Sequence, residues 1–230
     1  MVKAVAESLS EVRARADAAA RKAGRDPSDV RLMAVTKGFP RELVAESLAA
    51  GVSLFGENRV QEAEAKFADL GGRCELHLIG HLQTNKARAA AGLFSCVQSI
   101  DSLHTAEALN ARCAERERSM DVLLELNTSG EESKSGFRGR DELLSCLDAL
   151  GKLPRLRPRG LMTVGPLTDD PAKIRASFSV LRLLFEELRQ ASPSFDTISM
   201  GMSADFELAI EEGSTLVRVG TALFGSRRQA

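Results

Sequence analysis

The sequence contains neither tryptophan nor tyrosine, and it has only three histidines and four cysteines among its 230 residues. The absence of tyrosine excludes any mechanism in which this chain alone supplies a tyrosine as acid or base. The cysteines lie far apart, with no C-x-x-C pair and no histidine at ligand spacing, so we interpret them as reduced packing residues and expect no metal site. They are Cys74, Cys96, Cys113 and Cys146.

A strong net charge and a long apolar run are also missing. Lysine and arginine (31) almost balance aspartate and glutamate (32), which gives a formal net charge of −1 and favours neither nucleic acid nor an anionic membrane as a partner. No apolar run approaches the length of a membrane span. Glu7 and Glu11 fall where a signal peptide needs an uninterrupted apolar region. We therefore expect a cytoplasmic protein.

Short apolar runs alternate with amphipathic segments along the chain. Residues 5–16 carry apolar side chains at helical spacing and predict a first helix. Eight apolar runs follow, beginning at residues 32, 52, 75, 94, 121, 159, 196 and 215, and most are separated by helical patterns. Buried strands alternating with helices indicate a parallel sheet covered on both faces. Eight such units predict an α/β fold, a single-domain (β/α)8 TIM barrel over residues 1–230.

An open doubly wound sheet is the alternative architecture. It is not supported by a G-x-G-x-x-G motif after the first predicted strand, which a dinucleotide crevice would need. In a barrel, active sites form at the carboxyl ends of the strands, and polar residues gather at those ends here. They are Lys37, Glu57, Asn58, His81, Gln83, Asn85, Asn127, Thr128, Ser129, Ser199 and Arg218.

Lys37 ends the first predicted strand and shares a face with Met33 and Val35. If that face lines the barrel, burial disfavours the ammonium form and can lower the lysine pKa from about 10.4 toward about 7 to 8. A neutral amine attacks carbonyl groups, so Lys37 is a candidate Schiff-base residue. The alternative is a lysine that buries its aliphatic stem and keeps its ammonium group in water.

The last predicted strand carries Arg218 on the same face as Leu216 and Gly220. A guanidinium buried there requires hydrogen-bond acceptors. Gly220 allows close approach of the backbone to a ligand, and Thr221 begins a predicted short helix. Free N–H groups at a helix start, in the region where barrels often bind phosphate, predict a phosphate site.

The preceding stretch, residues 199–213, repeats this pattern. Ser203 is a plausible N-cap, Asp205 suits the first turn of a helix and Gly213 suits its end. Ser199 and Gly201 are predicted to face the same phosphate region. Ordinary helix capping is the alternative interpretation of this stretch, and the two do not exclude each other. A Schiff-base lysine, a phosphate cradle and an arginine that can meet a pyridine nitrogen together describe a pocket for pyridoxal 5′-phosphate.

Six segments also resemble, in order, those of the pyridoxal-phosphate homeostasis protein family, also called proline synthetase co-transcribed homologues. They are AVTKGFP, FGENRVQE, HLIGHLQTNKA, ELNTSGEESKSGF, GLMTVGP and ISMGMSADFELAIEEGSTLVRVGTALFGSR. The resemblance covers about residues 30 to 228. It implies a barrel similar to the N-terminal domain of bacterial alanine racemase.

The resemblance also implies roles for individual residues. It places the cofactor on Lys37, Arg218 near the pyridine nitrogen, the amides of Gly220 and Thr221 on the phosphate, and Ser199 nearby. The chain departs from the family pattern where it has Phe39, Leu76 and His81, and we assign His81 no functional role.

Alanine racemase works with its lysine and a tyrosine from a second domain, and we predict no second domain here. We therefore expect a protein that binds, buffers or delivers pyridoxal phosphate in vitamin B6 and amino-acid homeostasis, without robust turnover. Arg218 supports this prediction, because it cannot protonate the ring nitrogen as a carboxylic acid does. The alternatives are a pyridoxal-phosphate-dependent amino-acid racemase or decarboxylase, including weak racemase-like activity, and a cofactor-free Schiff-base aldolase.

Several assignments stay open at this level. Asn58 either contacts the cofactor's ring oxygen or caps the helix that follows it. Lys134, in the loop of residues 127–137, is either a secondary cofactor site or a solvated side chain. His77 is predicted to be a hydrogen-bonded core residue. We expect a monomer, with amino acids or cofactor-free pyridoxal-phosphate enzymes as the partners.

Overall fold

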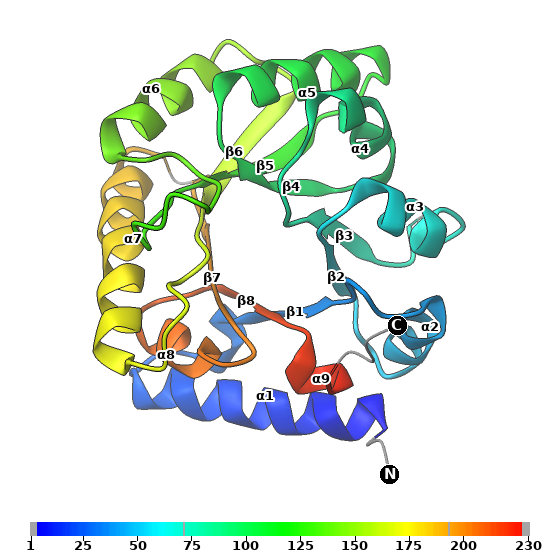
Figure 1. Ribbon diagram of the computed structural model, residues 1–230, viewed down its shortest axis with the longest axis vertical. Helices are drawn as coiled ribbons and strands as arrows, with labels where there is room; N and C mark the ends of the chain where they lie inside the picture. The colour runs from blue at the N-terminus through cyan, green and yellow to red at the C-terminus, as the bar shows by residue number, and fades with distance from the viewer. Residues whose placement is uncertain (1–3, 71, 193, 227–230) are drawn as a thin grey trace.

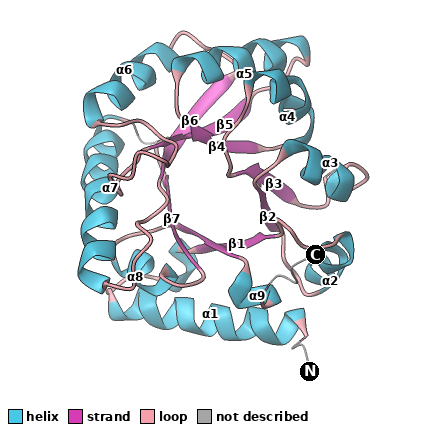
Figure 2. Cartoon of the chain, viewed as in Figure 1, coloured by secondary structure: helices cyan, strands magenta, loops and turns pink. Residues whose placement is uncertain are grey.

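A computed structural model describes residues 4–70, 72–192 and 194–226. Eight parallel strands form a closed barrel in sequence order, with helices around the outside (Figures 1 and 2). The predicted (β/α)8 barrel is confirmed, and each predicted apolar run overlaps one strand. The strands are β1 Arg31–Val35, β2 Leu54–Glu57, β3 Glu75–Leu78, β4 Cys96–Ile100, β5 Met120–Glu125, β6 Leu156–Met162, β7 Thr197–Met202 and β8 Leu216–Val219.

The helices alternate with the strands along the chain. An additional helix precedes the first strand and packs against the last two helices. The predicted first helix is confirmed as α1, whose buried face packs on α8 and α9 (Figure 1). The helices of the described residues are α1 Val5–Lys22, α2 Arg41–Ala49, α3 Val60–Phe67, α4 Ala87–Leu93, α5 Leu103–Glu115, α6 Arg140–Leu150, α7 Pro171–Ala191, α8 Phe206–Glu211 and α9 Thr221–Phe224. Two 3-10 turns, η1 Pro27–Asp29 and η2 Thr84–Lys86, complete them.

The apolar side chains form one large core between the strands and helices and two small clusters inside the barrel. This division follows from strands that are buried on both faces, so that alternate residues point to the helices and to the barrel axis. Polar side chains are buried inside the barrel as well, among them His77, Gln98, Ser199 and Arg218. Buried polar groups need hydrogen-bond partners, so these four residues mark a polar region of the barrel interior.

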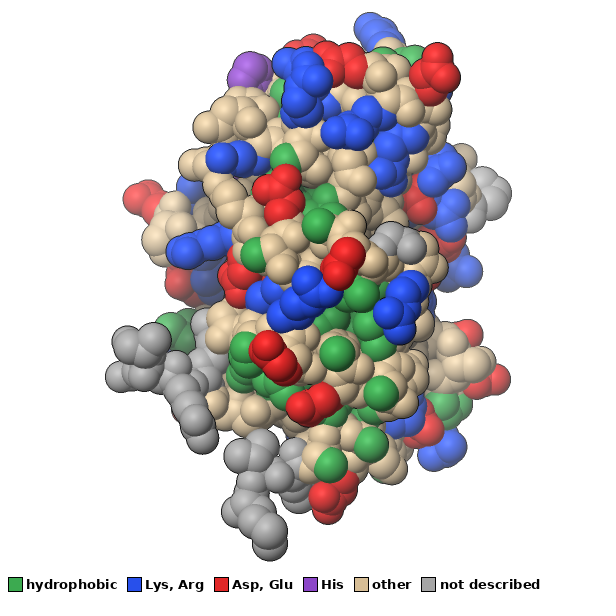
Figure 3. Space-filling view, turned by 90° about the vertical axis from the view of Figure 1, so that its right-hand side faces the viewer, with side chains coloured by type: hydrophobic (Ala, Val, Ile, Leu, Met, Phe, Trp, Pro, Cys, Tyr) green, Lys and Arg blue, Asp and Glu red, His purple; other side chains and the backbone are tan. Residues whose placement is uncertain are grey.

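β1 pairs with both β2 and β8, and its register sets Met33 beside Arg218. The segment after β1 and the segment after β8 therefore leave the barrel side by side. Within residues 4–70, 72–192 and 194–226, no helix has the length and apolar character needed to cross a membrane. Basic and acidic side chains are interspersed on the face that carries α2, α3 and α4 (Figure 3).

Candidate functional site

A cavity of about 220 Å³ opens at the carboxyl ends of β1 and β8. It brings together four of the predicted site residues, Lys37, Arg218, Gly220 and Thr221. Val35, Phe39, Ile79, Met202, Ser203 and Ala204 line the rest of it. Phe39 packs against Phe224 of α9 with ring centroids 5.1 Å apart, so the cavity has an apolar wall beside its polar groups. This combination is typical of a small-molecule site.

Lys37 is half-buried, and the backbone on both sides of it is fixed by charged side chains. The Lys66 ammonium donates to the Thr36 carbonyl at 2.6 Å, and the Gly38 N–H donates to the Glu62 carboxylate at 2.5 Å. Lys66 and Glu62 are themselves hydrogen-bonded at 2.6 Å on α3. The direction in which Lys37 leaves the strand is therefore set by α3.

Glu57, at the end of β2, is the third charged residue that holds the segment around Lys37. One of its oxygens accepts from the Thr36 hydroxyl at 2.6 Å and from Lys66 at 2.9 Å. Burial raises the pKa of the Glu57 carboxyl above its ordinary value, while the hydrogen bonds from Thr36 and Lys66 act in the opposite direction. Lys66 is thus the counter-charge of a carboxylate that water does not reach.

Arg218 lies on β8 and is only 4 % exposed. The predicted need for acceptors is met by the Ser199 carbonyl at 2.9 Å, the Ser199 hydroxyl at 2.7 Å and the Thr163 carbonyl at 2.7 Å. A guanidinium has five N–H donors, so two remain without a partner among the described residues. Burial lowers the pKa of Arg218 to about 10, with Glu125 and Asp205 opposing the shift, so the side chain stays charged at neutral pH.

Ser199 and Gly201, both predicted near the phosphate, do not line the cavity. The Ser199 side chain is buried inside the barrel against Arg218 and Gln98. Gly201 has a φ of +92°, and a Cβ there would lie 2.4 Å from the Cβ of Ala209, so its glycine serves the packing of α8. The register between β7 and β8 shifts between Ser199 and Met202, and this irregularity carries Met202 and Ser203 to the cavity instead.

Ser203 is a site residue whose use the sequence did not indicate. The prediction that it caps its own helix is wrong, because α8 begins at Phe206 with Asp205 as its N-cap residue. The Ser203 hydroxyl instead accepts from the backbone N–H groups of Gly220 and Ala222, each at 3.1 Å. The predicted short final helix is confirmed as α9, and its first N–H groups converge on Ser203 at the cavity wall.

The two remaining open residues lie apart from this cavity lining. Asn58 does not cap α3, whose N-cap position is Arg59, and within the described residues its buried Oδ1 has no hydrogen-bond partner. Its contact with a cofactor stays a prediction. Lys134 donates to Glu131 at 2.6 Å and to the Gly165 carbonyl at 2.8 Å, so it ties its loop to the loop after β6 and is not simply solvated.

Glu125 ends β5 inside the barrel mouth and is 6 % exposed. Burial raises the pKa of this carboxyl to about 7; the nearby Asp101 adds to the increase, and Arg218 and His81 oppose it. The folded state therefore favours the neutral form of the Glu125 carboxyl, and ionisation of this group destabilises the protein. Sequence reasoning placed no function at this residue.

We expect Glu125→Gln to change the pH dependence of stability. The folded pKa of about 7 lies above the unfolded value, so the wild-type protein loses stability relative to the variant as pH rises from about 4.5 to above 7. The shift corresponds to about 2–3 kcal/mol in the free energy of unfolding. Urea unfolding of both proteins at pH 4.5 and 8 measures it, with exposed Glu46→Gln as control. An equal difference between wild type and Glu125→Gln at both pH values would contradict the prediction.

Comparison with known proteins agrees with this geometry. The family model for the alanine racemase N-terminal domain matches residues 8–228. The pyridoxal phosphate homeostasis protein of Pseudomonas aeruginosa is 45 % identical over 224 residues, which cover 97 % of this chain and 96 % of that protein. The chain belongs to the alanine racemase N-terminal domain family and, within it, to the pyridoxal phosphate homeostasis proteins.

Solved structures show the same relationship. PipY of Synechococcus elongatus, solved with PLP bound, superposes with a TM-score of 0.82 at 38 % identity and covers 96 % of this chain and all of that one. Alanine racemase of Clostridium difficile superposes with a TM-score of 0.80 at 14 % identity, covering 98 % of this chain but 57 % of the racemase. The second likeness concerns the fold alone.

Proposed function

We propose that this chain binds pyridoxal 5′-phosphate as a Schiff base on Lys37 and acts in intracellular pyridoxal phosphate and amino-acid homeostasis. The observation that carries the proposal is the meeting of Lys37, Arg218 and the start of α9 on one cavity. The family supports it, because the relatives are named pyridoxal phosphate homeostasis proteins and PipY was solved with PLP bound.

The residues present fit this cofactor group by group. Lys37 offers an amine for the aldehyde. The N–H groups of Gly220 and Ala222 converge on one acceptor, the Ser203 hydroxyl, and a phosphate oxygen could accept from the same two groups in its place. The two Arg218 donors without a partner among the described residues suit the lone pair of a pyridine nitrogen. Thr221, as the first residue of α9, adds its backbone to the same wall.

We infer that the chain holds and transfers the cofactor without robust turnover. When bound, pyridoxal phosphate supplies an aldehyde that exchanges between amines, and such exchange requires only that Lys37 release it to an incoming amine. The proposal sets Arg218, which cannot protonate the ring, at the ring nitrogen in place of an acid, and the chain has no tyrosine. Amino acids or cofactor-free enzymes would receive the cofactor, and we propose a monomer in the cytoplasm.

A pyridoxal-phosphate-dependent amino-acid racemase or decarboxylase is the second candidate. Glu125 favours it, because a carboxyl with a pKa of about 7 in the barrel mouth can exchange protons at neutral pH. Incubation with a panel of L- and D-amino acids in deuterated water distinguishes the two. Rapid exchange of the α-proton of one amino acid would overturn the carrier proposal.

The test of cofactor attachment is Lys37→Ala. We expect the cofactor-loaded wild-type protein to show the visible absorption of a lysine Schiff base and the variant to lose it, with retention of the cofactor during gel filtration falling by at least about tenfold. The exposed Lys152→Ala is the matched control and should absorb like wild type. If Lys37→Ala keeps the absorption and Lys152→Ala does not differ, another lysine holds the cofactor and the proposal for Lys37 fails.

A further inference from the structure

A chain of hydrogen bonds crosses the barrel interior from Arg218 to the opposite end of the strands. The Arg218 guanidinium contacts the Ser199 hydroxyl at 2.7 Å, and that hydroxyl contacts Gln98 Oε1 at 2.7 Å. Gln98 Nε2 contacts His77 Nδ1 at 2.8 Å. The four residues come from β8, β7, β4 and β3, and the bond between Ser199 on β7 and Gln98 on β4 joins strands that are not neighbours in the sheet.

The first bond in this chain has a fixed direction, because an arginine only donates and the Ser199 oxygen must accept. The Ser199 hydroxyl then donates its own proton to Gln98 Oε1. The amide nitrogen of Gln98 then faces His77 and donates to Nδ1. This assigns the proton of a neutral His77 to Nε2, which lies 3.6 Å from the Glu75 carboxylate. Burial lowers the pKa of His77, with Glu75 opposing the shift, and this agrees with a neutral ring.

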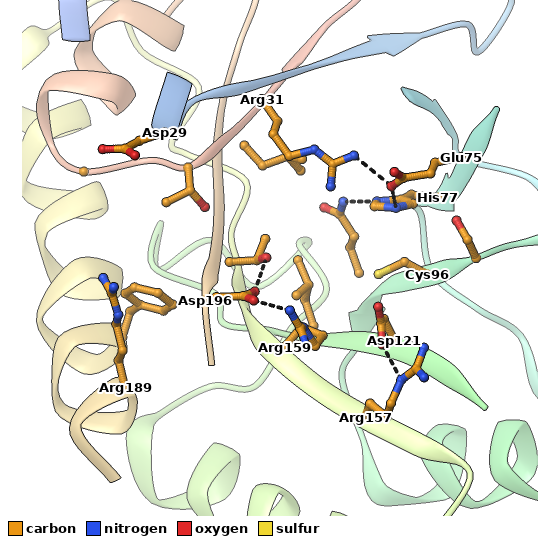
Figure 4. A pocket seen from close by; sticks show the side chains of 18 of the residues that line it. Asp29, Arg31, Glu75, His77, Cys96, Asp121, Arg157, Arg159, Arg189 and Asp196 are labelled. Atoms are coloured by element: carbon orange, nitrogen blue, oxygen red, sulfur yellow. Dashed lines mark hydrogen bonds and ion pairs between the residues drawn. The ribbon is translucent and has the colours of Figure 1, made fainter. Parts of the chain in front are cut away.

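The far end of the chain reaches a second cavity, of about 840 Å³, at the amino ends of the strands. Figure 4 shows this cavity, with His77 beside Glu75 and Arg31 directed toward the Glu75 carboxylate. Its charged lining is largely paired: Arg157 binds Asp121 at 2.7 Å, and Arg159 binds Asp196. We therefore interpret this end of the barrel as a structural region held by ion pairs and not as a second ligand site.

Burying such a polar chain costs stability, because each buried member needs hydrogen-bond partners that apolar side chains would not need. The chain lies behind Arg218, and this position indicates that it serves to orient the guanidinium. Because Gln98 Oε1 takes the serine proton, the lone pairs of the Ser199 hydroxyl face Arg218. Because a neutral His77 accepts from Gln98 Nε2, the Gln98 amide is held with Oε1 toward Ser199. The two Arg218 donors that remain are thereby held in one orientation.

We propose that Ser199, Gln98 and His77 are positioning residues that aim Arg218 at the ring nitrogen of the bound cofactor. The affinity of the cavity and the electronic state of the ring are then set partly by residues at the opposite end of the barrel. This inference rests on the proposed function, because it assigns the residues a role toward pyridoxal phosphate.

The first test is the binding of pyridoxal phosphate to Gln98→Met and Ser199→Ala, titrated at a temperature at which both are folded. We expect the Kd to rise about tenfold in each and the visible absorption maximum of the bound cofactor to shift, because a misdirected Arg218 loses its charge-assisted hydrogen bond to the ring nitrogen. Leu123→Ala is the matched control. It opens a hole in the barrel interior beside Cys96 and Met162 without removing a partner of Arg218. It should lower thermal stability and leave Kd within about twofold.

The second test uses wild-type protein without cofactor and does not depend on any variant folding. Nitrogen-15 NMR of labelled histidine should show His77 neutral and protonated on Nε2. A His77 protonated on Nδ1 would overturn the proposed direction of the chain. Equal Kd and spectra for Gln98→Met and wild type would overturn the positioning role. If wild-type protein itself binds no pyridoxal phosphate, the proposed function has failed.

Discussion

Replacing Lys66 by methionine should lower the free energy of unfolding by about 3–5 kcal/mol, because it leaves Glu57 as a buried carboxylate without its counter-charge. The same substitution removes the hydrogen bond to the Thr36 carbonyl and releases Glu62, so the backbone around Lys37 loses its support on both sides. Urea unfolding of the cofactor-free protein measures the first effect. The rate of Schiff-base formation with added pyridoxal phosphate measures the second.

Two further variants separate charge from packing in this prediction. The double variant Lys66→Met, Glu57→Gln removes both charges and should recover at least about 1–2 kcal/mol of the loss, since a neutral pair is less costly to bury than a single charge. Lys152→Met, at an exposed site, should change stability by no more than about 0.5 kcal/mol. A loss below about 1 kcal/mol for Lys66→Met would show that Lys66 does not neutralise Glu57.

Gly160→Ala should prevent the barrel from reaching its native stability, with a loss of more than about 4 kcal/mol or failure to fold. Gly160 lies within β6 with a φ of +155°, and an added Cβ would lie 1.6 Å from the carbonyl oxygen of Thr197 on β7. That oxygen belongs to the backbone of a central strand, so it cannot move away as a flexible side chain can. Expression in the soluble fraction and thermal unfolding measure the effect.

Gly139→Ala is the matched control for this substitution. Gly139 has an extended φ of −161° at the N-cap of α6, and a Cβ there meets no atom within 4 Å among the described residues. Its replacement by alanine should cost no more than about 1 kcal/mol, the difference between glycine and alanine at an N-cap position. Similar stability for Gly160→Ala and Gly139→Ala would show that β6 and β7 approach less closely than the structure has them.

The barrel could be predicted from sequence because most strands are buried on both faces and therefore read as continuous apolar runs; β6, whose first half carries Arg157 and Arg159, is recognisable only in its second half. Lys37 and Arg218 could be predicted because each is a cation at the end of, or within, such a run. Ser203 could not, since a serine before an acidic turn looks the same whether it caps its own helix or reaches another one. The register shift between Ser199 and Met202 in β7 carries Ser203 to the start of α9, and this shift is not visible in the sequence.

The supports of the site were also hidden from sequence reasoning. Lys66 occurs in an amphipathic segment where a lysine is normally solvated, and its burial depends on how α3 packs over β2. Gln98 on β4 and Ser199 on β7 come from distant parts of the chain, and nothing in their local patterns indicates that they meet. Residues that touch a ligand at strand ends leave a trace in the sequence, whereas residues that act through the barrel interior depend on three-dimensional closure.

The pairing of β1 with β8 has a consequence for the stability of the folded state. These two strands close the barrel, and their contact joins its first and last strands, so it carries a large loop-closure entropy cost. In the proposed function, one molecule held both by Lys37, beyond the end of β1, and by Arg218 on β8 would link these two strands. Because such a ligand binds the folded and not the unfolded chain, the proposal implies that the loaded protein is more stable than the empty one.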